Sequence, residues 1–136
     1  MSDAECQDGG CQCGAVRYRV TGPAVACTLC HCISCRRATG GVKVAWAVFE
    51  KSEVAVTGSI DEYSSSPGIY WGHCPRCHSL VTYRRDTRPN HLDITTATLD
   101  QPDAFPPTVE IWVGERCGWE VLNPALEHKE RSSLNE

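Results

Sequence analysis

The chain has 136 residues, of which 41% are hydrophobic and 22% are charged, and its formal net charge is -4. This size and composition suit a single globular domain that spans residues 1–136. The negative balance counts against broad nucleic-acid binding as the main task, and the sequence shows neither an apolar run long enough to cross a membrane nor a secretion signal. We therefore expect a cytoplasmic protein that has no membrane partner.

Short patterns in which apolar residues alternate with others, typical of β-strands, recur along the chain. In chain order they span residues 16–20, 42–48, 54–56, 69–71, 80–83, 92–98 and 109–113. Glycine and proline separate them, as at Gly22-Pro23 and Ser66-Pro67-Gly68. We therefore predict a mainly β domain whose strands are mostly antiparallel.

Helical signals are few. A short turn is expected from Ser34 to Ala38, and a second short helix from Asn123, a suitable N-cap that is followed by Pro124. The core of the domain is expected to run from about residue 9 to about residue 126. Residues from about 131 to 136 are polar and predict a frayed tail.

Cysteine is the most informative residue type, because seven of the ten cysteines fall into three tight clusters. The clusters are Cys11-x-Cys13, Cys30-x-Cys32-x-x-Cys35 and Cys74-x-x-Cys77. In a reducing compartment, thiols at these spacings favour metal binding over disulfides. A disulfide between neighbours as close as Cys11 and Cys13 would also be strained.

Two thiol pairs and one thiol triplet divide most simply into a closed metal site and an open one. A structural zinc takes four thiolates, so Cys11 and Cys13 can share one ion with Cys74 and Cys77. The triplet supplies three ligands and leaves a fourth position for water or a substrate sulfur, as in catalytic zinc sites. We therefore expect two Zn²⁺ ions in each chain, with chemistry at the open position.

Cys27 leaves two other partitions open, because Cys27-x-x-Cys30 is itself a thiol pair. Cys27 would either close the triplet site as a fourth ligand or, together with Cys30, form a zinc ribbon with Cys74 and Cys77. An iron–sulfur cluster on the triplet is a further alternative, since thiolates also suit iron.

The remaining polar residues near the clusters have weaker spacing arguments. Cys6 and Cys117 are isolated and are interpreted as free thiols. His31 and His78 lie beside ligand cysteines, and we expect them to support the ligands rather than bind metal themselves. Glu110 and His31 are the conceivable acid or base, and the spacing assigns that role to neither.

The order and the flanking residues of the clusters resemble one protein family. The matching motifs are Gly10-Cys11-x-Cys13-Gly14-x-Val16-Arg17-Tyr18, Cys30-His31-Cys32-x-x-Cys35-Arg36-Arg37-x-Thr39-Gly40, Cys74-Pro75-x-Cys77 and Trp119. Over about residues 9 to 126 they are similar to the glutathione-dependent formaldehyde-activating enzyme and centromere protein V family. The resemblance implies a β-tent fold of small antiparallel sheets.

The resemblance also implies roles for the seven clustered cysteines. Structural zinc would be held by Cys11, Cys13, Cys74 and Cys77, and catalytic zinc by Cys30, Cys32 and Cys35. The implied activity is that of a carbon–sulfur lyase, which joins or splits S-(hydroxymethyl)glutathione. The partner would then be glutathione, another small thiol, or the aldehyde adduct of such a thiol.

Two arginines directly after the triplet are candidates for substrate binding. The guanidinium groups of Arg36 and Arg37 can pair with a substrate carboxylate or balance the charge of the site. The chain departs from the family pattern at Cys27, His78 and Glu110, so the substrate stays open. The alternative function is a non-catalytic, zinc-stabilised module that binds thiols or another protein, and the sequence does not determine the oligomeric state.

Overall fold

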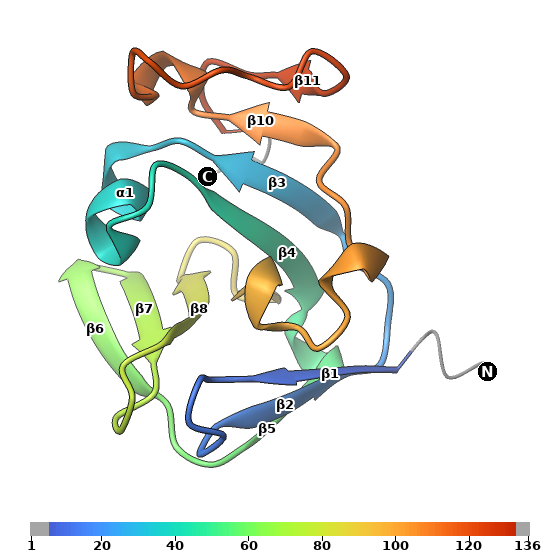
Figure 1. Cartoon of the computed structure of the whole chain (residues 1–136). Coiled ribbons are helices and arrows are strands. Elements are labelled where there is room, and N and C mark those ends of the chain that lie inside the picture. The colour runs from blue at the N-terminus through green and yellow to red at the C-terminus, as the bar shows by residue number, and fades with distance from the viewer. Residues whose placement is uncertain (1–5, 133–136) are drawn as a thin grey trace.

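The computed structural model describes residues 6–132, which form a mainly β domain with one α-helix (Figure 1). Strands account for 41% of the chain and helical segments for 15%. The prediction of a mainly β domain of the β-tent kind, with little helix, is therefore confirmed. None of the helices between residues 6 and 132 is both long enough and apolar enough to cross a membrane.

The strands and the helix follow one another in a fixed order. They are β1 (Gln7–Gly10), β2 (Arg17–Val20), β3 (Ala26–Cys30), α1 (Ile33–Thr39), β4 (Val44–Glu50), β5 (Val54–Thr57), β6 (Asp61–Ser66), β7 (Ile69–His73), β8 (Leu80–Arg85), β9 (His91–Thr95), β10 (Val109–Ile111) and β11 (Glu127–His128). Short 3-10 helices cover Lys51–Glu53, Thr96–Thr98, Pro102–Ala104 and Val113–Glu115.

The strands form two sheets. One has the order β1-β2-β5, and the other has the order β11-β10-β3-β4-β9-β8-β7-β6. Most pairs are antiparallel, but β10 runs parallel to both β3 and β11, and one sheet is larger than the small sheets expected. The parallel pairs arise because a long connection after β9 brings the chain back beside β3.

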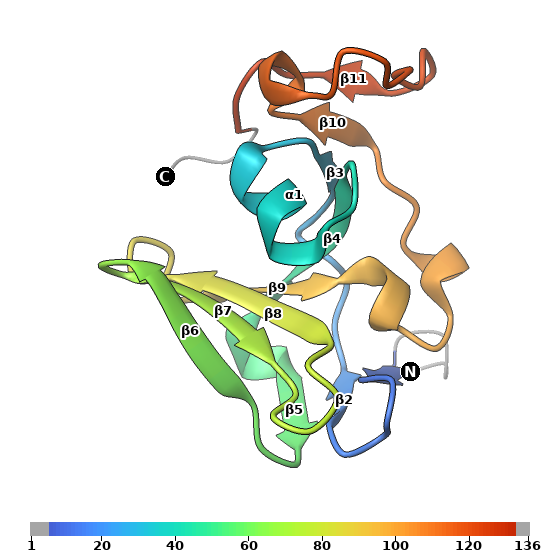
Figure 2. The ribbon, with the colours of Figure 1, turned by 60° about the vertical axis from the view of Figure 1, so that its left-hand side comes forward.

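The larger sheet is strongly bent, and this bend creates the space for the site. Figures 1 and 2 show α1 lying between the part of the sheet that holds β3 and β4 and the part that holds β6, β7 and β8. The loop that joins β3 to α1 therefore faces the inner surface of β7 and β8.

Strand β4 separates two hydrophobic cores because its successive side chains point to opposite faces. Ala47 and Phe49 pack into a first core with Val16, Tyr18, Val20, Val81, Ile94, Leu99 and Phe105. Trp46 packs into a second core with Trp71, Val109 and Ile111. The first core also contains Cys11 and Cys74, and the second contains Cys30 and Cys35, so each core holds part of one cysteine cluster.

Several strands lie outside the predicted patterns, for a physical reason in each case. Strands β1 and β6 are polar, and β6 is exposed along its whole length, so neither shows an apolar alternation. The strand predicted over 92–98 ends at Thr95 and continues as a 3-10 helix. The strand predicted over 109–113 ends at Ile111, because Trp112 adopts a left-handed conformation with φ 55°.

The helix predicted from Asn123 was wrong, whereas the turn predicted from Ser34 to Ala38 lies within α1. The side chain of Asn123 accepts a hydrogen bond from the backbone N–H of Ala125 at 2.9 Å, which stabilises a turn instead of a helix. The chain then pairs with β10 as β11. Arg131, expected to begin a frayed tail, accepts a backbone hydrogen bond from Trp112, while residues 133–136 lie outside the described part of the chain.

Candidate functional site

The first cysteine cluster lies where two turns meet. Cys11 and Cys13 follow β1, Cys74 and Cys77 follow β7, and the four sulfurs all lie within 4.8 Å of one another. Gly14 has a φ of 80°, which favours glycine and allows the tight turn after Cys13. The two turns belong to different sheets, so this cluster joins the small sheet to the large one.

Hydrogen bonds reach three of the sulfurs of this cluster. The backbone N–H of Val16 donates to Cys11 Sγ at 3.2 Å, and that of Arg76 donates to Cys74 Sγ at 3.3 Å. The side chain and backbone of Ser79 lower the pKa of Cys77 to about 5. Four converging soft sulfur donors fit a tetrahedral zinc ion and leave no further position open.

The second cluster lies on one short stretch of chain. Cys30 ends β3, Cys32 is the N-cap of α1, Cys35 lies in its first turns, and the three sulfurs are within 4.8 Å of one another. Cys32 Sγ accepts from the backbone N–H of Cys35 at 3.2 Å, and Cys35 Sγ accepts from Trp46 Nε1 at 3.4 Å. The cap and the indole thus hold two of the three sulfurs in place.

The electrostatics of the three thiols favour a cation between them. Hydrogen bonds from the side chains of Cys30 and then Cys35 lower the pKa of Cys32 to about 3. The same contact with Cys32 raises the pKa of Cys30. One thiolate therefore forms readily, and its negative charge disfavours ionisation of the next thiol. A divalent ion among the three sulfurs would offset this repulsion. Within residues 6–132, no histidine or carboxylate joins this group as a fourth ligand.

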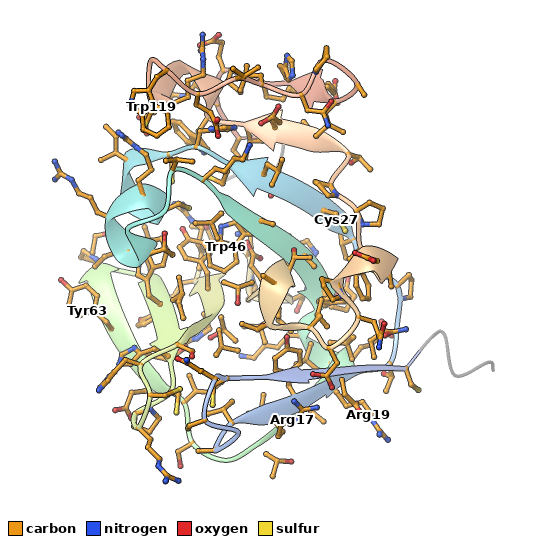
Figure 3. The ribbon with its side chains drawn as sticks, in the orientation of Figure 1. Arg17, Arg19, Cys27, Trp46, Tyr63 and Trp119 are labelled. Atoms are coloured by element: carbon orange, nitrogen blue, oxygen red, sulfur yellow. The ribbon has the colours of Figure 1, made fainter. Side chains whose placement is uncertain are left out.

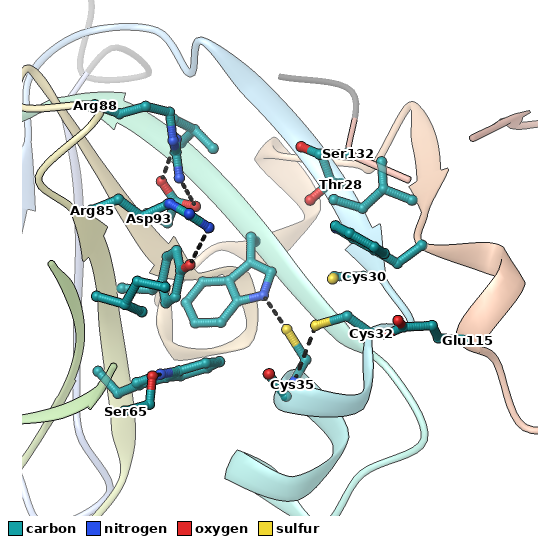
Figure 4. Close-up of a pocket in the computed structure, with 18 of the residues that line it drawn as sticks. Thr28, Cys30, Cys32, Cys35, Ser65, Arg85, Arg88, Asp93, Glu115 and Ser132 are labelled. Carbon is teal, nitrogen blue, oxygen red and sulfur yellow. Dashed lines mark hydrogen bonds and ion pairs between the residues drawn. The ribbon is translucent and has the colours of Figure 1, made fainter. Parts of the chain in front are cut away.

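The three sulfurs open onto a pocket of about 370 Å³ that also contains four aromatic residues (Figure 4). Its lining includes Trp46, Trp71, Tyr83 and Trp112. The rings of Trp46 and Trp71 lie 6.2 Å apart between centroids, and those of Trp71 and Tyr83 lie 4.8 Å apart. The pocket therefore joins a polar sulfur end to an apolar wall, which suits a small organic ligand.

A second group of charged residues lines the same pocket. Arg88 donates to Asp93 at 3.3 and 3.4 Å, and Arg85 Nη1 donates to the hydroxyl of Tyr83 at 3.2 Å. The sequence analysis did not single out these residues as a site. The sequence contains part of the signal, because Tyr83 and Arg85 are two residues apart on one strand and share one face. It does not show that Tyr83 pairs with Asp93, because that contact depends on strand register.

Cys27 belongs to neither cluster. Residues three apart in a strand point to opposite faces, so Cys27 and Cys30 cannot bind one ion from β3. Thr28 and Cys30 line the pocket, whereas Cys27 packs against the first core. The structure therefore contradicts both partitions that make Cys27 a ligand.

The structure places the two candidate arginines outside the pocket of the three cysteines. Arg36 Nη1 donates to Cys117 Sγ at 3.3 Å, so that thiol has a partner. Arg37 lines a neighbouring cavity that also contains His73 and His78. The substrate-binding roles of Arg36 and Arg37 stay predictions.

The two residues considered as acid or base face away from the pocket. His31 and Glu110 are fully buried, and His31 Nε2 lies 2.7 Å from Glu110 Oε1. Glu110 Oε2 also accepts from the backbone N–H of Asn123 at 2.6 Å. Neither side chain lines the pocket, so we interpret the pair as support for the segment that carries the cysteines. His78 has a φ of 65°, a left-handed conformation that glycine adopts more readily than histidine.

Fold and site together define a mainly β protein with two cysteine clusters that can hold metal ions. The chain belongs to the glutathione-dependent formaldehyde-activating enzyme family, whose model matches residues 6–115. A crystal structure of a Rhodobacter sphaeroides protein has a similar fold, with a TM-score of 0.58 and 23% sequence identity, covering 68% of this chain and 87% of that chain. A search of curated proteins finds no match.

Proposed function

We propose that the protein is a zinc-dependent carbon–sulfur lyase that acts on a thiol/aldehyde adduct, as in the synthesis of S-(hydroxymethyl)glutathione. The observation that carries this proposal is the convergence of three thiols, and no fourth ligand among the described residues, on a pocket lined by aromatic rings. Membership of the family supports the same chemistry. Cytoplasmic location follows as an expectation, because a reducing compartment keeps thiols available.

The two clusters would divide the metal binding between them. Cys11, Cys13, Cys74 and Cys77 would hold a structural Zn²⁺. The second Zn²⁺ would be held by Cys30, Cys32 and Cys35. A zinc ion bound by three thiolates lowers the pKa of a substrate thiol and holds its sulfur ready for reaction.

The residues of the chain would position the reactants and exclude water. In the synthetic direction, the substrate sulfur forms a bond to the aldehyde carbon while the C=O π bond opens and its oxygen takes up a proton; in the reverse direction the C–S bond breaks. The Trp46 indole N–H holds Cys35, and the rings of Trp71 and Tyr83 cover the apolar side of the pocket. Such a wall strengthens electrostatic interactions within the site by excluding water.

A non-catalytic thiol-binding module is the second candidate, and one observation favours it. The two carboxylates in the pocket lining are both hydrogen-bonded, Glu115 to the backbone N–H of Ile33 at 2.9 Å and Asp93 to Arg88. A carrier would use the same open position without a proton donor. A protein-interaction module is less well supported, although Trp119 (labelled in Figure 3) and Val121 are exposed.

The test compares the zinc-loaded protein with buffer alone, because thiols and formaldehyde combine without help. Exchange spectroscopy by NMR measures the rate at which glutathione and its hydroxymethyl adduct interconvert. We expect the protein to exceed the buffer rate, the Cys32→Ser/Cys35→Ser variant to return to it, and the Cys27→Ser control to behave like the natural chain. Thiol binding without any increase over the buffer rate would favour the carrier.

A further inference from the structure

The pocket has a cationic end that lies opposite its three cysteines. Figure 4 shows Arg85, Arg88 and Asp93 together on one side of the aromatic wall and the cysteine sulfurs on the other. Neither arginine belongs to the segment that carries the thiols. This end takes no part in metal binding, and its guanidinium groups suit a ligand that carries an anionic group.

Strand geometry explains why Arg85 points into the pocket. Tyr83 and Arg85 are two residues apart on β8, so their side chains share one face, and Tyr83 pairs with Asp93 on β9. Arg84 faces the other way, where its guanidinium bonds Glu62 at 2.7 Å and stacks 4.0 Å from the ring centre of Tyr70. Adjacent arginines on one strand therefore have different surroundings.

The cationic end has hydrogen-bonding capacity for an anion. The side chain of Arg88 is only 8% exposed, and its contacts to Asp93 at 3.3 and 3.4 Å are longer than the roughly 2.8 Å of a strong charge-assisted bond. Its buried Nε has no partner among residues 6–132. Arg85 has five N–H donors, so it can bind a carboxylate in addition to the Tyr83 hydroxyl and its other contacts.

A continuous wall connects the sulfur end to this cationic end. Cys35 Sγ lies 3.4 Å from Trp46 Nε1, the rings of Trp46 and Tyr83 lie 5.8 Å apart, and the Tyr83 hydroxyl lies 3.2 Å from Arg85. The two ends are thus separated by the width of two aromatic rings. A ligand that reaches both ends needs a sulfur, a short chain and an acidic group.

Charge complementarity determines the orientation of such a ligand. The cysteine end carries thiolate charge and repels a carboxylate, while the guanidinium end attracts one. We propose that Arg85, with the hydroxyl of Tyr83, forms a subsite that selects thiols bearing a carboxylate and holds that carboxylate while the sulfur lies at the three cysteines. The sulfur end of this arrangement rests on the proposed function, whereas the carboxylate end does not.

The first experiment compares two thiols of matched length on the zinc-loaded protein. Isothermal titration calorimetry gives dissociation constants for mercaptohexanoate and mercaptohexanol, whose chains can span the two rings and which differ in the carboxylate. We expect mercaptohexanoate to bind about tenfold more tightly, as a charge-assisted hydrogen bond predicts. Equal affinities would overturn the proposal.

Variants locate the source of this preference. Arg85→Gln should reduce the preference to about onefold, and Arg85→Lys should restore part of it. Arg84→Gln is the matched control, since it removes the same charge from the neighbouring position on the outer face, and it should keep the preference. A preference that survives Arg85→Gln, or that disappears instead in Arg37→Gln, would contradict the proposed subsite.

A ligand without sulfur separates this proposal from the lyase proposal. Butyrate has the carboxylate but no thiol, and its binding is followed through the indole N–H resonance of Trp46, which lines the pocket. We expect butyrate to shift this resonance in the natural protein and not in Arg85→Gln. If butyrate binds in this way while no thiol binds, the subsite stands and the proposed function fails. If thiols bind and butyrate does not shift the resonance, the subsite fails and the proposed function is unaffected.

Discussion

The two cysteine clusters differ in how the chain supplies them. Cys13 and Cys74, which touch in the first cluster, are 61 residues apart and belong to turns of different sheets. The second cluster comes from the single stretch between residues 30 and 35. A metal that joins distant turns restricts the unfolded chain strongly, whereas a metal held by one short loop restricts it little. We infer that the first cluster stabilises the fold and the second serves the pocket.

The surroundings of the two clusters support the same division. Cys74 is fully buried in the first core, which contains residues of both sheets. Cys32 is only half-buried and lines the pocket. The loss of a ligand in the first cluster should therefore affect folding, and the loss of one in the second should affect ligand binding.

The largest effect is expected from Cys74→Ser. This change removes the fully buried one of four thiolates, so the domain should lose its metal there and become less stable by about 5 kcal/mol or more. Circular dichroism during urea unfolding and elemental analysis of zinc measure both quantities. An unchanged unfolding midpoint would show that this cluster does not hold the two sheets together.

A smaller but clear loss of stability is expected from Glu110→Ala. The change leaves the buried ring of His31 and the backbone N–H of Asn123 without their acceptor, which costs about 3 kcal/mol. His31 lies between Cys30 and Cys32, so this variant tests whether its buried contact with Glu110 stabilises the segment that carries the triplet. Glu127→Ala, at an exposed carboxylate, is the control and should change stability by less than about 0.5 kcal/mol.

The double variant Cys32→Ser/Cys35→Ser should lose function more than stability. Serine is close to cysteine in size and is a suitable N-cap at position 32. The hydroxyl at the buried position 35 packs less favourably than the thiol, so we expect a loss of about 1 to 2 kcal/mol. Zinc content should fall from two ions to about one, and thiol binding should disappear. Unfolding of this variant would contradict the division between the two clusters.

The smallest effect is expected from Cys27→Ser. Cys27 packs against the first core without belonging to a cluster, so a hydroxyl there should cost about 1 kcal/mol. Zinc content and thiol binding should stay the same. A lost zinc ion would show that Cys27 takes part in metal binding after all.

Local patterns predicted much of the fold, and the misses have physical causes. Strands β4 and β8 contain buried apolar residues and are rich in β-branched and aromatic side chains, so they were predicted close to their observed positions. Strand β6 has no buried face, and its pairing with β7 is what makes it a strand. The helix expected at Asn123 failed because the next residues pair with β10, a contact that local propensity does not contain.

The candidate site could also be predicted only where it depends on residues that are close together in the sequence. Spacing along the chain groups the thiols, because residues two to five apart can present their sulfurs to one point, and the structure brings the seven cysteines together in these groups. The pocket opposite them depends on β8 and β9, which lie far away in the sequence. Arg36 and Arg37 are neighbours of the triplet in sequence and face elsewhere, while Arg85 is distant in sequence and lines its pocket.

The sequence by itself therefore determined the class of protein, the mainly β character of the fold and the grouping of the thiols. These features depend on local alternation and on short spacings, which act over a few residues. Only the tertiary structure decided that Cys27 faces away from the triplet, that His31 pairs with Glu110, and that Arg85 lines the same pocket as the triplet sulfurs. Strand register and the bend of the large sheet set those contacts, because they bring together residues that are up to about eighty positions apart.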